Sequence, residues 1–139
     1  MAILADQNTK VLVQGITGRE AASFTHDMLE YGTQVLAGVT PGKQGQEIFG
    51  VPVYDTVRTA MEKHGCDASV ISVPPAMVKE AALEAIEHGI KLAVIVTERV
   101  PRRDVIEILE SADENGARVI GPNTLGLISP HMVRLGMAG

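Results

Sequence analysis

The chain has 139 residues, 45% hydrophobic and 21% charged, a balance typical of one globular domain spanning residues 1–139. Its formal net charge of −5, without a basic cluster, argues against nucleic acid as a partner. A single cysteine, Cys66, excludes an internal disulfide and a cysteine-rich metal site, and we predict no metal site. Because no apolar run approaches about 18 residues and no leader pattern precedes the first strand, we expect neither a membrane helix nor a signal peptide.

Apolar runs alternate with helical patterns along the chain. The apolar runs predict strands near Lys10–Gln14, Gln34–Val39, Ala68–Val73, Lys91–Val96 and Arg118–Ile120. The helical patterns predict helices near Arg19–Tyr31, Thr56–His64, Met77–His88 and Arg102–Glu114. The strands are continuously apolar, as parallel strands covered on both faces are. The sequence therefore predicts a single α/β domain with a doubly wound, mostly parallel, Rossmann-like sheet.

Local patterns add finer predictions. Val51–Tyr54 should be a short edge strand, because Pro52 cannot serve a central one. The spacing of Val105, Ile106 and Leu109 predicts one buried helical face. The tail, residues 132–139, is weakly patterned, and we expect it to fray or to pack elsewhere.

The turn after the first strand is the strongest candidate site. Gly15 and Gly18 allow a sharp turn and let a ligand approach the backbone. The unpaired N–H groups and the positive dipole end of the following helix attract a phosphate. Thr17 and Glu20 have the spacing of a capping box, and Arg19 lies between them. A short Gly-x-x-Gly motif alone is also compatible with a capped turn that binds nothing.

The second strand indicates which nucleotide this turn would hold. A domain that binds NAD usually carries a carboxylate there to grip the ribose diol, but Gly38–Lys43 has none. Lys43 offers a cation instead, which favours a ligand with a phosphate near its ribose, such as NADP or CoA. An ordinary solvated loop lysine is the alternative.

Three further loops follow predicted strands at the edge where open α/β sheets bind ligands. Val73 and Pro74 can form an apolar wall beside a base or a pantetheine arm, or simply begin a helix. Thr97 can hydrogen-bond a ligand, whereas Glu98 can cap a helix or form a surface ion pair. Asn123 can donate and accept across the cleft, or serve only its own turn.

Taken together, these motifs resemble the N-terminal CoA-binding domain of the succinyl-CoA synthetase alpha subunit and of related acid–CoA ligases. The resemblance runs from about residue 8 to residue 128 and rests on Gly15–Glu20, Glu30–Thr33, Gly38–Lys43, Thr97–Glu98 and Gly121–Asn123. It implies that the first turn binds a CoA phosphate, that the lysine contacts CoA and that the Thr-Glu loop lies near the cofactor. The corresponding positions in this chain are Thr17, Gly18, Arg19, Glu20, Lys43, Thr97 and Glu98.

The chain departs from the family pattern at three places that bear on CoA affinity. Ala21 follows the first turn where the family usually has glycine, Arg99 replaces the glycine of its Thr-Glu-Gly motif, and Thr124 replaces the cysteine of its Gly-Pro-Asn-Cys motif. The family also continues into a second domain with a phosphorylated histidine. None of the four histidines here stands in a matching context, so we predict no catalytic residue.

The resemblance implies a CoA-binding domain or subunit of a nucleotide-dependent acid–CoA ligase, in a cytoplasmic or organelle-matrix location. Its partner would be a subunit or domain that carries the phosphohistidine and binds the nucleotide. A free-standing CoA-binding regulatory module without catalysis is the alternative. An NADP-linked reductase is disfavoured, because no convincing acid, base or substrate domain follows the nucleotide-binding part.

Overall fold

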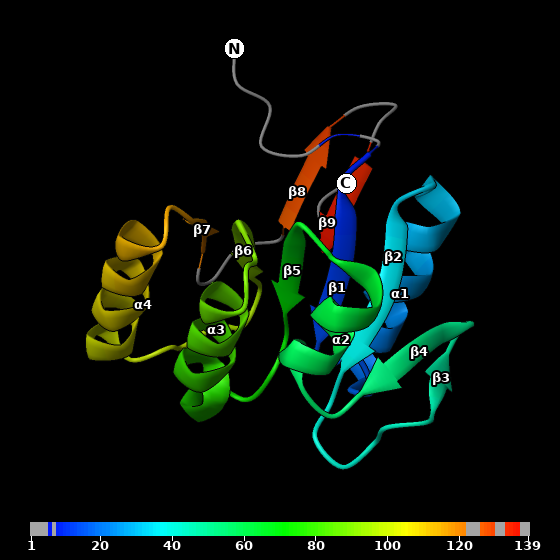
Figure 1. Cartoon of the computed structure of the whole chain (residues 1–139), viewed down its shortest axis with the longest axis horizontal. Helices are drawn as coiled ribbons and strands as arrows, with labels where there is room; N and C mark the ends of the chain where they lie inside the picture. Colours follow the sequence, from blue (N-terminus) through cyan, green and yellow to red (C-terminus); the bar gives the residue numbers. More distant parts are fainter. Residues whose placement is uncertain (1–5, 7, 122–125, 130–132, 137–139) are drawn as a thin grey trace.

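Parallel strands dominate the sheet of this protein, in a computed structural model that describes residues 6, 8–121, 126–129 and 133–136. The seven strands lie in the order β3-β4-β2-β1-β5-β6-β7, and every neighbouring pair is parallel except β3 with β4. They are β1 (Lys10–Gln14), β2 (Gln34–Val39), β3 (Glu47–Ile48), β4 (Val51–Tyr54), β5 (Ala68–Ile71), β6 (Leu92–Ile95) and β7 (Arg118–Ile120). The predicted α/β class with a mostly parallel, Rossmann-like sheet is confirmed (Figure 1).

Helices connect most of the parallel strands, whereas β2 leads to β4 through β3. The helices are α1 (Arg19–Tyr31), α2 (Val57–His64), α3 (Val78–Glu87) and α4 (Arg102–Glu114), with a 3-10 turn, η1 (Pro75–Met77), just before α3. Glycines with positive φ end or follow all four, as expected of a left-handed C-terminal residue: Gly32, Gly65, Gly89 and Gly116. None of the helices in the described part of the chain has the length and apolar character needed to cross a membrane.

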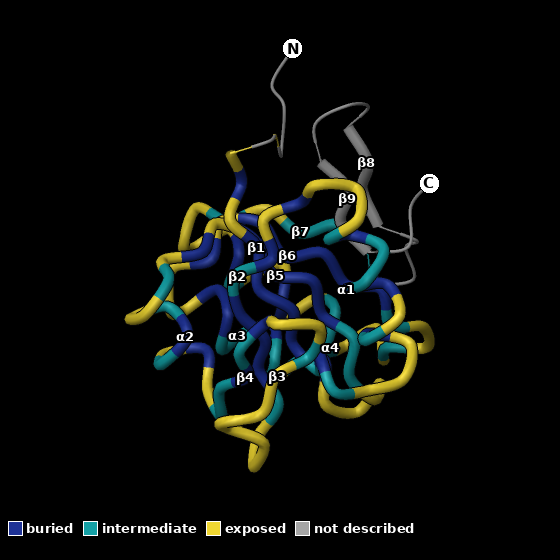
Figure 2. Tube along the Cα trace, turned by 90° about the vertical axis from the view of Figure 1, so that its right-hand side faces the viewer, coloured by how far each residue is buried: buried dark blue, intermediate teal, exposed yellow. Residues whose placement is uncertain are grey.

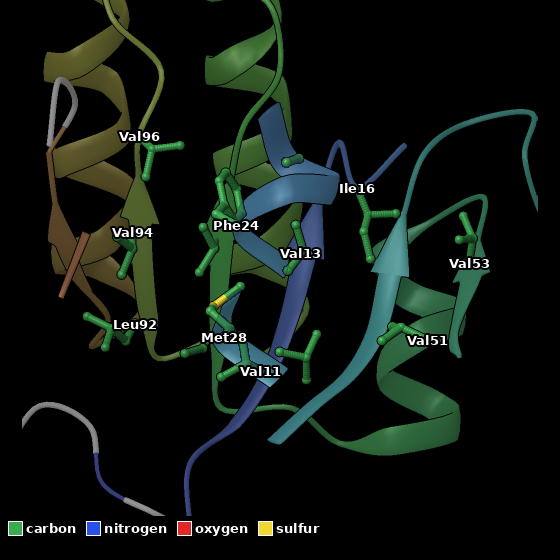
Figure 3. Close-up of a cluster of buried hydrophobic side chains, with 14 residues drawn as sticks. Val11, Val13, Ile16, Phe24, Met28, Val51, Val53, Leu92, Val94 and Val96 are labelled. Carbon is green, nitrogen blue, oxygen red and sulfur yellow. The ribbon is translucent and has the colours of Figure 1, made fainter. Parts of the chain in front are cut away.

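Alternate residues of β1 supply the two faces of the core. Val11 and Val13 of β1 face α1 and pack with its Phe24 and Met28 (Figure 3). Leu12, between them, packs in a separate cluster on the opposite face with residues of α2. Buried strands therefore occupy the centre of the molecule, and the exposed chain lies in the outer turns (Figure 2).

Two sequence predictions about packing are wrong. Val51–Tyr54 is a strand, but it is not the edge, because the two-residue β3 pairs with it on its outer side. Ile106 and Leu109 are exposed, whereas α4 buries Ile108 and Ala112. The pair Ile106 and Leu109 and the pair Ile108 and Ala112 both have helical spacing. The pair that faces α3 and the sheet is the second, which contains the small alanine.

The single cysteine lies near the amino end of β5, away from the carboxyl ends of the strands. Cys66, two residues before β5, is only 3% exposed. Burial, with a smaller contribution from the neighbouring Asp67 carboxylate, raises the pKa of its thiol to about 11. Cys66 is therefore a protonated core residue at neutral pH.

A second, two-stranded sheet completes the described chain. Strands β8 (Gly126–Ser129) and β9 (Val133–Gly136) pair antiparallel, and β9 lies beside α1. Part of the tail that the sequence left weakly patterned is thus a strand.

Candidate functional site

The loops predicted to bind a ligand meet at one edge of the sheet. Because β1, β2, β5 and β6 run parallel, the segments after their last residues all emerge on the same side. These segments are 15–18, 40–46, 72–77 and 96–101. The sheet thus gathers into one region the first turn, the lysine loop, the proline loop and the Thr-Glu loop.

Gly15 occupies a position that only glycine fits. Its φ is +85°, and a Cβ there would lie 2.0 Å from the backbone oxygen of Ser72. Its N–H donates to the carbonyl of Val39 at 2.7 Å, while the N–H of Ser72 donates to the carbonyl of Gln14 at 2.9 Å. The first turn is therefore fastened between the ends of β2 and β5.

The start of α1 has no side-chain cap. Gly18 is the N-cap residue, with an extended backbone (φ −68°, ψ 151°), and it makes no side-chain hydrogen bond to the first turn of the helix. The Thr17 hydroxyl instead donates to the Thr40 hydroxyl oxygen at 3.2 Å. The predicted capping box of Thr17 and Glu20 is therefore wrong.

The missing cap leaves the helix terminus accessible. Gly18, Arg19 and Glu20 are all exposed. The first N–H groups of an α-helix have no partner within the helix, and the dipole makes this end positive. This terminus is consequently an accessible site for an anion.

Lys43 lies on a loop that is held by a carboxylate the sequence analysis missed. Asp55, just after β4, accepts hydrogen bonds from the backbone N–H groups of Gly42 at 2.8 Å and Gln44 at 3.1 Å. The Gln44 side chain in turn accepts from the N–H of Asp55 at 3.2 Å. Lys43 itself is exposed, so its backbone is fixed while its side chain remains free to reach an anion. The position of Asp55 directly after a predicted strand was the sequence signal that could have identified it.

Thr97 joins two of the loops. Its hydroxyl donates to the carbonyl of Val73 at 2.9 Å and accepts from the N–H of Val73 at 3.2 Å. Val73 is half-buried, whereas Pro74 and Glu98 are exposed. The Thr97 hydroxyl therefore positions the proline loop, and the sequence analysis did not foresee this bond.

Arg99 has a backbone conformation that usually requires glycine. Its φ is +63°, in the left-handed region, and the residue is exposed. Side chains with a Cβ are disfavoured there by about 1–2 kcal/mol. The departure from glycine at this position therefore places an arginine on a strained backbone.

We expect the unfolding free energy of the Arg99→Gly variant to be about 0.5–1 kcal/mol larger than that of the parent. The strain energy relieved in the left-handed backbone exceeds the entropic cost of ordering a glycine on folding. The affinity of the variant for CoA, the ligand implied by the resemblance, should be equal or higher. Urea unfolding and calorimetry measure the two quantities. A clear loss of affinity with an intact circular dichroism spectrum would instead make Arg99 a ligand contact.

A mainly apolar pocket opens beside these loops, on the α3 side of the sheet. Its volume is about 450 Å³ with the open mouth included. Its lining combines the ends of β1 and β2 with α3 and the loop before it: Gln14, Gly15, Val39, Pro41, Val73, Met77, Glu80, Ala81 and Glu84. The sequence analysis proposed Val73 as an apolar wall but missed the α3 residues, because nothing local to a helix says which strand ends it will face.

Buried polar bonds form the floor of this pocket. Gln14 is only 2% exposed; its amide donates to the carbonyl of Ala81 at 2.8 Å, and its side-chain oxygen accepts from the Ser69 hydroxyl at 2.6 Å. Glu84 accepts from the N–H of Val57 at 2.8 Å, at the start of α2. These bonds join α3 to β1, β5 and α2, so the pocket has a fixed shape before any ligand arrives.

Two candidates remain. Asn123 is outside the described residues. On α1, away from the loops, His26, Asp27 and Glu30 bring potential metal-ligand atoms within 4.8 Å of one another. The His26 ring lies 3.3 Å from the Glu30 carboxylate in an ordinary helical pair of exposed side chains, which explains the cluster without a metal.

Comparisons with known proteins agree on one family. A family model described as "CoA binding domain" matches residues 6–99. The succinate–CoA ligase [ADP-forming] subunit alpha of Methanothermobacter thermautotrophicus is 50% identical over 135 residues, which are 97% of this chain and 46% of that protein. The ADP-forming sulfoacetate-CoA ligase subunit SqwL of Acholeplasma sp is 46% identical over 98% of this chain and 46% of its own. This chain thus spans about half the length of these relatives.

The fold also matches solved structures. The structure of ATP citrate lyase from Methanothrix soehngenii in complex with citrate and coenzyme A superimposes with a TM-score of 0.86 and 25% identity, over 96% of this chain and 24% of that one.

Proposed function

This chain belongs to the family of CoA-binding domains, and on that basis we propose that it holds CoA at the loop edge of its sheet for an acid–CoA ligase. The observation that carries the proposal is the first turn, where Gly15 brings the backbone against the end of β5 and Gly18 precedes α1 without a side-chain cap. CoA is the cofactor of the family, and the residues at this edge fit three of its parts: the pyrophosphate, the adenine and the ribose phosphate.

The pyrophosphate would lie at the start of α1. The open N–H groups after Gly18 and the helix dipole both favour negative charge there. Thr17 and Arg19 flank the same turn, and Arg19 adds an exposed guanidinium. Glu20 is exposed one residue further on, so its carboxylate can turn away to solvent.

The adenine ring would enter the pocket lined by Val39, Pro41, Val73 and Ala81. Two carboxylates, those of Glu80 and Glu84, also line this pocket, so it is unsuited to a phosphate. A neutral, flat ring with an amino group fits apolar walls that carry an acceptor at the rim. The pocket and the helix start thus divide the neutral and anionic parts of the ligand between them.

Lys43 would contact the ribose phosphate. Its loop lies next to Pro41 of the pocket, and Asp55 holds the backbone on both sides of the lysine. A carboxylate directly after β2 would repel a phosphorylated ribose. Segment 40–46 contains none, which supports the same assignment.

The whole reaction would need further parts. In a ligase of this type the CoA thiol attacks an acyl phosphate at the carbonyl carbon, and inorganic phosphate leaves. The contribution of this domain would be to hold the thiol-bearing cofactor in position. A subunit or domain with the phosphohistidine and the nucleotide site would supply the acyl phosphate, in the cytoplasm or an organelle matrix.

The Gly18→Asp variant tests the proposal with little disturbance of the fold. Aspartate is a favourable N-cap residue, and Gly18 has the extended backbone such a cap needs. The added Cβ would lie 3.3 Å from the carbonyl oxygen of Gly15, a close contact that a shift of a few tenths of an ångström relieves, so the helix should keep its stability. The new carboxylate would occupy the place of the phosphate, and we expect CoA affinity to fall about tenfold or more. For the wild-type chain, CoA at about a hundredfold excess over its dissociation constant should raise the unfolding free energy by about 2.7 kcal/mol.

Calorimetry and thermal unfolding with CoA, dephospho-CoA, NAD and NADP measure these effects. Stabilisation by NADP and not by CoA would contradict the proposal that CoA is the cofactor. Equal CoA affinity in Gly18→Asp and the wild type would show that no CoA phosphate binds at this turn. CoA binding that has no effect on a reconstituted ligase reaction would favour the regulatory module.

A further inference from the structure

The outer face of α4 carries an apolar pair that the fold leaves uncovered. Ile106 is 50% exposed and Leu109 48% exposed, although both are large and apolar. The helix lies beside β7, the last strand of the sheet, at one end of the molecule (Figure 1). We propose that this face pairs with the α4 helix of a second copy of the chain, in antiparallel orientation, and forms a weak two-fold dimer.

The residues along this face form one stripe. Arg102, Ile106, Leu109 and Asp113 are separated by four, three and four positions, the spacing of a seam between paired helices, and all four are exposed. The stripe thus has an apolar centre, a positive end and a negative end. We call these four residues the α4 stripe.

The order of charges on α4 is unfavourable for the helix alone. Arg102 and Arg103 lie in its first turn and Glu114 in its last, whereas the helix dipole favours acidic residues at the start and basic ones at the end. Asp104, also in the first turn, offsets part of this cost. The arrangement becomes favourable when an antiparallel helix brings an acidic end against each arginine end.

The α4 stripe is complementary to itself. In an antiparallel pair centred between Ile106 and Leu109, each Ile106 meets Leu109 of the second copy, and each Arg102 meets Asp113 of the second copy. Exposed Arg103 and Glu110 flank the stripe and oppose each other in the same way. A surface that contains both halves of its own match fits a two-fold interface, which is why we assign a second copy and not a different protein.

The interface would be small. A helix of 13 residues is about 20 Å long, and one such helix on each side covers less than a standard stable interface. The dimer should therefore be weak and depend on concentration. Sedimentation equilibrium of the 139-residue chain, from about 10 µM to about 1 mM, covers the range in which such a dimer forms.

Charge reversal tests the pairing. Arg102→Asp or Asp113→Arg alone places like charges opposite each other, and we expect the dissociation constant of the dimer to rise about tenfold in each. The double variant, Arg102→Asp with Asp113→Arg, restores opposite charges and should return the constant to the wild-type value. Lys63→Asp, which reverses an exposed charge on α2, is the control and should have no effect.

A chain that stays monomeric at every concentration would overturn the proposal, and so would a dimer that no α4 reversal weakens. A double variant as weak as the single ones would exclude the antiparallel register. If the wild-type chain is monomeric and the reversals instead weaken its binding to a ligase partner, the face belongs to that partner. None of these outcomes depends on CoA, so the cofactor proposal stands or falls separately.

Discussion

The Gly15→Ala variant is expected to lose about 3 kcal/mol or more of unfolding free energy, together with its affinity for CoA. The added Cβ would lie 2.0 Å from the backbone oxygen of Ser72 and 2.9 Å from a side-chain carbon of Val73. Relief requires the first turn to move away from β5, which breaks the bonds that fasten it between β2 and β5. The positive φ adds its own cost of about 1–2 kcal/mol. Urea unfolding and calorimetry with CoA measure both losses.

Gly32→Ala is the matched control for this variant. Gly32 has a similar φ of +97° at the end of α1, but nothing lies within 4 Å of the Cβ that alanine would add. It should lose only the conformational cost and keep its CoA affinity. Equal losses of stability in the two variants would mean that the contact with Ser72 relaxes freely, and that the first turn is not held where the structure has it.

The Lys43→Ala variant should bind CoA with a free energy weaker by about 1.5–3 kcal/mol, the range for a hydrogen bond to a charged group. The fold should be unaffected, because the Lys43 side chain is exposed and its loop is held through the backbone by Asp55. Calorimetry with dephospho-CoA identifies the contact. If the ribose phosphate is the partner, wild type and variant should bind dephospho-CoA almost equally.

Lys63→Ala, a change at an exposed lysine on α2, serves as the control for the loss of one positive charge. Its CoA affinity should match that of the wild type. The same CoA affinity in Lys43→Ala would show that Lys43 is only a solvated loop lysine.

Elements whose signals are local were predictable from the sequence. The strand at Lys10–Gln14 and the helices at Arg19–Tyr31 and Arg102–Glu114 have the predicted bounds. In each, an apolar run or a helical repeat ends at a glycine or a turn, and these signals depend only on nearby residues. Alternation of such elements then determined the fold class.

Features that depend on distant partners were not predictable. Thr17 does not cap α1, because its hydroxyl bonds instead to the hydroxyl of Thr40, 23 residues further along the chain. The two-residue β3 is a strand only because β4 lies beside it. The α3 half of the pocket likewise exists because the Gln14 amide bonds the carbonyl of Ala81, 67 residues further along the chain. For the site, the sequence therefore indicated the loops but not the bonds between them.

The position of Cys66 has a consequence for the chemistry of a protein that handles a thiol cofactor. A disulfide of CoA is attacked only by a thiolate that can reach it, and the raised pKa of Cys66 keeps its sulfur protonated while the core shields it. It also lies at the amino end of β5, whereas the proposed site is at the carboxyl ends of the strands. Oxidised CoA should therefore not become trapped on this domain as a mixed disulfide, which keeps the CoA sulfur free for the acyl transfer proposed above.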